Sequence, residues 1–469
     1  MRVSIFARGL LTAGLLVGAS SGLIAGRATA ADKDTAKVEP IAPSFATLPT
    51  LTSIVFERIG DSVKLVGRDA RRQLLVTGQD ERGLQHDITR LVTLSVQQND
   101  VVSLTSEGLI KPLKNGTASI RATLPDGRMA ELPIEVAGYD ESAPVNFPNQ
   151  VVPIFTKLAC NSGGCHGKAA GQNGFKLSLL GFEPKEDYEH LVIESRGRRL
   201  FPAAPEKSLL LTKALNESPH GGGQRLEKDT HEYRLLLRWI EQGMPYGTDK
   251  DPVLTGITVL PTERMMNKNA EQQLTVVATY SDGSTEDITR TAQYESNNTD
   301  LATVSTSGLI ATKQRSGDVA VMARYQGQVA VFRAGLPQGA EIASWPEPVN
   351  FIDNEVLAHL KSLGIAASPR SSDSEFLRRV TVDICGRLPT AAETQEFLAS
   401  SDPNKRNVLI DRLLDSPEYA EHFALKWSAI LRNRRPSPGH QLGSYLFHGG
   451  FVTVSRKIDR MMMHSCVIC

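Results

Sequence analysis

Short stretches in which apolar and polar residues alternate dominate two parts of the chain. Ala118–Leu124 (ASIRATL) and Gln273–Tyr280 (QLTVVATY) are examples, and alternation of period two is typical of strands with one buried face. Turn-forming dipeptides separate these stretches at Asn115-Gly116, Asp126-Gly127 and Asp282-Gly283. Short alternating strands split by such turns predict antiparallel sandwiches.

The two strand-rich parts repeat each other. Asp-Ile-Thr-Arg occurs at 87–90 and again at 287–290, an offset of 200 residues. We therefore predict two all-β sandwiches, over residues 49–138 and 253–336. Asp87 and Asp287 open the repeated segment, and a carboxylate there is expected to bind its own backbone as a turn residue. A cation site is not expected, because it needs several clustered oxygen ligands.

The repeated pattern, which includes Ser106–Ile110 (SEGLI) and Thr306–Ile310 (TSGLI), resembles the bacterial immunoglobulin-like group 2 (BIG2) family along both copies. The resemblance implies modules of exported surface proteins that serve as spacers or in adhesion. It implies a location more than an activity.

Between the sandwiches the apolar residues take helical spacing. Val151, Ile154, Phe155 and Leu158 fall on one face of a helix that leads into a cysteine–histidine motif. A second helix, which ends near Gly243, carries a similar stripe made of Leu235, Leu236, Trp239 and Ile240. These features predict an all-α module over residues 147–248.

The motif is Cys160–Lys168 (CNSGGCHGK). Two thiols followed directly by a histidine suit covalent haem, in which the thiols bond the vinyl groups and His166 reaches the iron. Four residues separate the cysteines instead of the usual two, and Gly163 and Gly164 are expected to supply the positive φ of the longer loop. His220 in the sequence PHGGG is the candidate for the second iron ligand, with Met244 as the alternative.

From Phe147 to Gly247 the module resembles the planctomycete cytochrome-c-like domains, on FTKLACNSGGCHGKAAGQNGFKLSLLGF, PEKSLLLTKA and LLLRWIEQGMPYG. The resemblance implies haem c, with Cys160 and Cys165 as thioether cysteines and His166 as the proximal ligand. PHGGG replaces the family's usual distal methionine, which makes His220 the distal ligand in a bis-histidine site.

Other interpretations of the motif stay open. Cys160 and Cys165 can form a disulfide in an exported protein, or join His166 and His220 around zinc. His190 and His231 are expected at the surface. Three nearby arginines form either a solvated loop or a partner for haem propionates; they are Arg196, Arg198 and Arg199.

Residues 350–432 predict a run of capped helices. Gly364 ends the first, Ser372/Glu375 and Thr390/Glu393 form capping boxes, and Asp402-Pro403 and Ser416-Pro417 each place a proline at the first helical position. This segment resembles the start of a planctomycete, cytochrome-associated domain of unknown function (DUF1549), which implies no catalytic residues. Cys385 is expected to be a small buried side chain. Residues 433–469 are predicted to be an irregular tail, of a truncated or frameshifted product.

The first thirty residues combine basic Arg2 and Arg8, an apolar core and an Ala-Thr-Ala end at Ala30, which predicts a cleaved signal peptide. A linker over residues 31–48 follows. No later stretch is expected to span a membrane. The chain has 52 basic and 52 acidic residues, a balance that argues against a nucleic-acid partner.

Together these observations predict an exported periplasmic or surface protein that carries haem c for electron transfer, with a redox partner that the sequence does not identify. The alternative is a non-catalytic structural or adhesion protein in which the two cysteines are bonded. Since no Ser/His/Asp or paired-carboxylate arrangement stands out, we do not expect the chain itself to be an enzyme.

Overall fold

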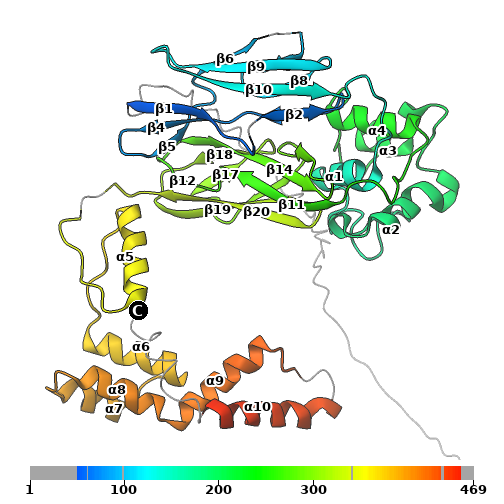
Figure 1. The fold of residues 1–469 in the computed structure, drawn as a ribbon. Coiled ribbons are helices and arrows are strands. Elements are labelled where there is room, and N and C mark those ends of the chain that lie inside the picture. The colour runs from blue at the N-terminus through cyan, green and yellow to red at the C-terminus, as the bar shows by residue number, and fades with distance from the viewer. Residues whose placement is uncertain (1–49, 61, 98–99, 340–341, 435–437, 456–469) are drawn as a thin grey trace, which may run out of the picture. The chain divides into compact units, whose positions relative to one another are not determined.

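The computed structural model describes residues 50–455 except 61, 98–99, 340–341 and 435–437. The expected signal peptide, the linker that follows it and the terminal Cys466 and Cys469 lie outside the described residues. Within them the fold class is as predicted, with two β-sandwiches, a helical segment between them in the sequence, and an all-α C-terminal region (Figure 1).

The first sandwich is built from antiparallel sheets with one parallel pair. Its sheets have the orders β1-β4-β5, β2-β10-β9-β6 and β3-β8-β7, and β2 runs parallel to β10. The strands are β1 (Leu51–Phe56), β2 (Val63–Val66), β3 (Arg72–Gln73), β4 (Val76–Asp80), β5 (Gln85–Asp87), β6 (Thr93–Gln97), β7 (Val102–Leu104), β8 (Leu109–Pro112), β9 (Gly116–Thr123) and β10 (Met129–Ala137).

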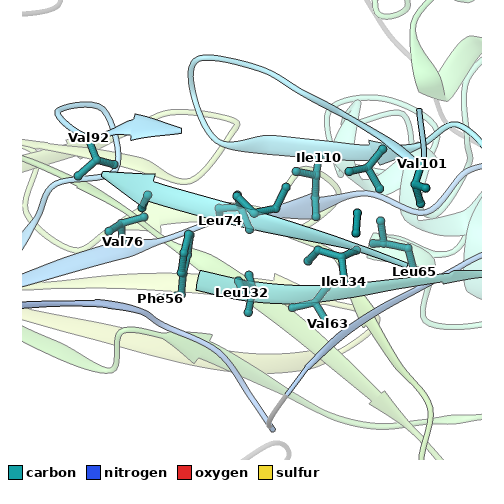
Figure 2. Close-up of a cluster of buried hydrophobic side chains, with 14 of the residues drawn as sticks. Phe56, Val63, Leu65, Leu74, Val76, Val92, Val101, Ile110, Leu132 and Ile134 are labelled. Atoms are coloured by element: carbon teal, nitrogen blue, oxygen red, sulfur yellow. The ribbon is translucent and has the colours of Figure 1, made fainter. Parts of the chain in front are cut away.

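The alternation seen in the sequence places one face of each long strand in the core. In β9, Ala118, Ile120 and Ala122 are buried while their neighbours are half-buried or exposed. Figure 2 shows Leu132 and Ile134 of β10 in the same cluster, together with Phe56 of β1. Burial of these side chains is the main source of stability for a module of this kind.

The second sandwich repeats this topology. Its sheets have the orders β11-β14-β15, β12-β20-β19-β16 and β13-β18-β17, and β12 runs parallel to β20. The strands are β11 (Leu254–Leu260), β12 (Glu263–Met265), β13 (Glu271–Gln273), β14 (Thr275–Tyr280), β15 (Thr285–Asp287), β16 (Gln293–Ser296), β17 (Ala302–Val304), β18 (Leu309–Thr312), β19 (Gly317–Tyr325) and β20 (Gln328–Leu336). The sequence repeat is thus a repeat of fold.

The helical module has a core around Phe147 and Trp239, both fully buried, with ring centroids 5.4 Å apart. The stripe predicted on the last helix is confirmed, because Leu235, Leu236 and Ile240 are also buried. The helices are η2 (Phe147–Val151), α1 (Val152–Lys157), η3 (Leu179–Gly181), α2 (Pro184–Tyr188), η4 (Glu189–Ile193), η5 (Glu194–Gly197), η6 (Pro205–Lys207), α3 (Leu209–Ala214) and α4 (His231–Glu241).

The C-terminal region follows most of the predicted caps. Both capping boxes are formed, Ser416 caps its helix, and Gly364 ends the first helix in the left-handed conformation. The start predicted at Asp402-Pro403 is wrong, because the Asp402 carboxylate instead accepts from the Asn404 N–H in a turn before the helix. The helices are α5 (Phe351–Leu363), α6 (Asp373–Cys385), α7 (Ala391–Ala399), α8 (Lys405–Leu414) and α9 (Pro417–Ile430).

The tail was predicted to be irregular, and in its described part this is wrong. A short turn, η7 (Pro438–His440), leads into a further helix, α10 (Gln441–Ser455). Phe451 of α10 stacks on Trp427 of α9, with ring centroids 6.4 Å apart. The sequence of α10 lacks the apolar periodicity that would predict a helix, and in the structure the helix packs on α9 through aromatic rings.

Among the described residues, no helix combines the length and the apolar character that are needed to cross a bilayer.

Candidate functional site

The cysteine–histidine motif begins at a helix end. After α1 the Ala159 N–H donates to the Thr156 carbonyl and the Cys160 N–H to the Phe155 carbonyl, and Ala159 has a φ of 58°. This is the bond pattern of a Schellman cap. The positive φ expected at Gly163 and Gly164 is found instead at Ala159, because the chain reverses where the helix ends and not within the glycine pair.

Helix α1 is held from outside the module. The Lys157 ammonium donates to the carbonyls of Ala292 and Thr306 in the second sandwich, at 2.7 and 2.6 Å. It also lies 5.5 Å from the centre of the Tyr294 ring. These contacts fix the end of the helix only three residues before Cys160.

The loop itself is closed by its own backbone. The His166 N–H donates to the Cys160 carbonyl, and the N–H groups of Cys165 and Gly167 both donate to the Ser162 carbonyl, each over 3.0 Å. Asn161, within the loop, is fully buried and donates through Nδ2 to Thr156 Oγ1 at 2.8 Å. The position of His166 is therefore set by a closed hydrogen-bonded turn.

His166 and His220, 54 residues apart in the sequence, are brought together. Their ring centroids are 6.5 Å apart and the ring planes differ by 8°. Each Nδ1 lies within hydrogen-bond distance of a backbone carbonyl, that of Phe175 for His166 (3.0 Å) and that of Gly223 for His220 (2.8 Å). A ring that donates Nδ1–H in this way presents Nε2 as the acceptor, which is the arrangement of metal-binding histidines.

Both rings line a cavity of about 840 Å³, within the range of cofactor sites. Its apolar wall consists of Phe155, Leu158, Phe175, Leu177, Leu191, Leu209, Leu210 and Leu236. Its charged lining residues are all basic, with no Asp or Glu among the described residues that form it; they are Arg198, Arg199, Lys213 and Arg225. Such a cavity matches an apolar ligand that carries negative charge.

Burial shifts the pKa values of two side chains of the motif, Cys160 and His166. It raises the pKa of the Cys160 thiol to about 12 and lowers the pKa of His166, so both groups are neutral near pH 7. The two cysteines are not bonded to each other. Within the described ranges no three His, Cys, Asp or Glu side chains are grouped so as to hold a metal ion.

Other sequence candidates lie elsewhere. Met244 is not among the residues lining the cavity; it packs against the module core and its carbonyl accepts from the Tyr188 hydroxyl. His231 is half-buried at the start of α4, not exposed as expected, and burial lowers its pKa to about 4. His190 is also half-buried and lies 3.0 Å from the Glu194 carboxylate.

Of the three arginines expected near the motif, Arg199 has a structural role. Its guanidinium donates to the carbonyls of His190 and Gly174 and lies 4.6 Å from the centre of the Phe175 ring. Arg198 lines the cavity and is exposed, whereas the side chain of Arg196 is outside the described part. Sequence reasoning missed Lys213 and Arg225, although both flank the PHGGG segment that it singled out.

Two family models match parts of the chain. Residues 253–330 match the bacterial Ig-like domain (group 2). Residues 351–444 match a family described as a protein of unknown function (DUF1549). The second match reaches beyond Arg432, where the sequence resemblance had ended, and neither of these two matches includes the helical module.

Similar proteins cover only part of the chain. Ice-binding protein 1 of Shewanella frigidimarina is 25% identical over 281 residues, which are 60% of this chain and 28% of that protein. This chain therefore spans less than a third of that relative's length.

Among solved structures, domains 5-6 of the S-layer protein SbsC are 12% identical, cover 62% of this chain and 100% of that one, and give a TM-score of 0.26. The titin domains z1z2 in complex with telethonin are 10% identical, with coverage of 62% and 100% and a TM-score of 0.13. At these scores the likeness adds nothing to the fold described above. The family matches and the fold together make the chain a multidomain protein with Ig-like sandwiches and a DUF1549 domain.

Proposed function

We propose that the chain is an exported surface or periplasmic protein whose helical module binds haem c and relays electrons. Cys160 and Cys165 would hold the porphyrin through thioether bonds, and His166 and His220 would ligate its iron. Export is supported by the leader pattern of the first thirty residues, which resembles a cleaved signal peptide, and by the Ig-like modules.

The separation of the two imidazoles is the observation that carries this proposal. Two metal–nitrogen bonds of about 2 Å on opposite sides of one iron, plus about 1 Å from each nitrogen to its ring centre, give about 6 Å between centroids. His166 and His220 are 6.5 Å apart and nearly parallel. Both rings also have Nδ1 placed against a carbonyl, which favours Nε2 as the ligand atom.

The cavity supports the same ligand independently of the motif. A porphyrin is a flat apolar ring with two carboxylates, and the cavity combines an apolar wall with a basic lining. Arg198 and Arg225 are exposed members of that lining. The Arg225 Nε–H donates to the Gly222 carbonyl at 2.9 Å, and its terminal nitrogens and the Arg198 guanidinium are the groups we assign to the propionates. A basic lining also favours retention of a dianionic ligand at low ionic strength.

The residues of the site have separate roles in this proposal. Bound haem iron supplies a site that takes up and gives up one electron. Lone pairs from His166 and His220 would hold the iron, which would leave no open position for a substrate and would suit electron transfer. Phe175 covers one side of His166, with a ring centroid 4.6 Å from the imidazole centroid, and keeps water from that side.

Expression of the full chain with a c-type haem maturation system tests the proposal. After acid–acetone extraction, which removes non-covalent haem, wild-type protein should keep a pyridine haemochrome spectrum. The C160A/C165A variant should lose it.

A wild-type chain without covalent haem would contradict the proposal. If, in addition, its thiols react with alkylating reagents only after reduction, a Cys160–Cys165 disulfide and a structural role would replace it. If haem binds but is extracted equally from both proteins, the module has a haem site and the thioether bonds are refuted.

A further inference from the structure

The two sandwiches contact each other through equivalent residues. The Asp87 carboxylate accepts from the Gln273 N–H at 2.6 Å, and the Asp287 carboxylate accepts from the Gln73 N–H at 2.8 Å. The two contacts are related to each other by the 200-residue offset of the sequence repeat, because Asp87 corresponds to Asp287 and Gln73 to Gln273. These contacts of the interface are therefore reciprocal, as in an isologous dimer.

The side chains around these contacts repeat the same reciprocity. Arg90 Nη2 donates to Gln273 Oε1 at 3.1 Å, and Arg290 Nη2 donates to Gln73 Oε1 at 3.2 Å. Each glutamine amide nitrogen donates in turn to carbonyls of its own sandwich. Gln73 and Gln273 are each 1% exposed, so these polar groups depend on the partner sandwich to be satisfied.

Each aspartate uses its two oxygens for different sandwiches. Oδ1 of Asp87 accepts from the N–H and hydroxyl of Thr89, at 2.8 and 2.6 Å, and so closes the turn that the sequence predicts. Oδ2 of Asp87 accepts from the Gln273 N–H of the other sandwich. Asp287 divides its oxygens in the same way, with Oδ1 bound to the Thr289 N–H.

The groups that these carboxylates reach are sheet edges. Among the strands that the structure describes, β3 pairs only with β8, and β13 pairs only with β18. Gln73 of β3 and Gln273 of β13 would otherwise leave an N–H of an edge strand unpaired and buried. Each sandwich therefore closes an edge of the other with a carboxylate.

We propose that the face formed by Asp-Ile-Thr-Arg and by Gln73, or by the equivalent Gln273, pairs with a sandwich that carries the same residues. In this chain the two repeats pair with each other through this face. The second sandwich then is not a free spacer beyond the helical module. The helical module is an insertion between two halves of a closed pair. The inference does not depend on haem.

Hydrogen exchange of the full chain tests the pairing. In Asp87→Asn the remaining oxygen stays with Thr89, and the amide NH₂ faces the Gln273 N–H, so two donors oppose each other. Exchange at the Gln273 amide, in the opposite sandwich, should accelerate about tenfold or more. Asp287→Asn should do the same at the Gln73 amide.

Matched controls separate pairing from general damage. Asp126→Asn and Asp282→Asn change aspartates that bind only their own hairpin turns, and they should leave both glutamine amides protected. Arg90→Met, which keeps the Asp87 turn intact, should loosen the same edge if the aspartate variants fail to fold. Acceleration confined to the mutated sandwich, or equal in variants and controls, would overturn the proposal.

Discussion

Gly167, directly after His166, is the position where a single methyl group should do the most damage. A Cβ there would lie 2.0 Å from the Asn161 carbonyl oxygen and 2.9 Å from that of Ser162. Both are backbone atoms already engaged, by the N–H of Leu180 for Asn161 and by those of Cys165 and Gly167 for Ser162. The loop must open by more than an ångström to admit Gly167→Ala, and overpacking of this kind costs about 1–3 kcal/mol.

Gly164 offers a control in the same loop. No atom lies within 4 Å of a Cβ built there, and its φ is not positive. In the reduced apoprotein, the rate of Cys160 alkylation reports loop opening. Gly167→Ala should raise that rate about tenfold or more, since about 1.4 kcal/mol is a factor of ten in an opening equilibrium. Gly164→Ala should leave it within about twofold, and equal rates in the two variants would refute the account of the loop.

Three further changes test other parts of the structure. Lys157→Met should speed hydrogen exchange over α1 several-fold, because two carbonyl contacts to the second sandwich are lost; Lys185→Met on α2 is the control, and equal exchange would contradict the docking. The holoprotein of Arg225→Glu should have a lower reduction potential than wild type in spectroelectrochemical titration. The substitution replaces a cation beside the cavity by an anion, and an anion disfavours the less positive, reduced iron. An unchanged or higher potential would count against a haem in this cavity. Hydrogen bonds to Arg387 and Thr390 lower the pKa of Glu393 to about 2 from an ordinary value of 4.5. The contribution of this carboxylate to the stability of the fold is therefore present above pH 4.5 and is lost as the pH falls through about 2. Glu393→Gln should therefore destabilise α7 by about 1 kcal/mol at pH 7 and by much less near pH 2, measured by hydrogen exchange in α7. A difference that is independent of pH would refute this interpretation.

Local patterns predicted the fold well because they depend on neighbours in the sequence. Alternation in β9, the apolar stripe of α4 and the capping box at Ser372 each involve residues only a few positions apart. One failure arose where a tertiary contact contributes, since α10 packs on α9 through aromatic rings. The other is local, because the Asp402 carboxylate closes a turn with the Asn404 N–H and the helix starts after that turn.

The candidate site could be predicted in part. The thiols, His166 and His220 were identified from the motif and the resemblance, and the structure places the two imidazoles together. The basic residues contributed by α3 and by the segment after PHGGG could not be predicted, because their approach to the motif depends on how the module folds. The reciprocal bonds of Asp87 and Asp287 were missed for the same reason, since only half of each carboxylate acts locally.

The measurement that most directly tests the bis-histidine haem site is the low-temperature electron paramagnetic resonance spectrum of the oxidised full-length holoprotein. Two axial imidazoles whose planes differ by only 8° split the iron orbitals unequally. The account therefore predicts a rhombic low-spin spectrum, and a high-spin spectrum for His220→Ala. A wild-type high-spin signal would contradict ligation by both histidines, as would a low-spin signal that the His220→Ala variant leaves unchanged.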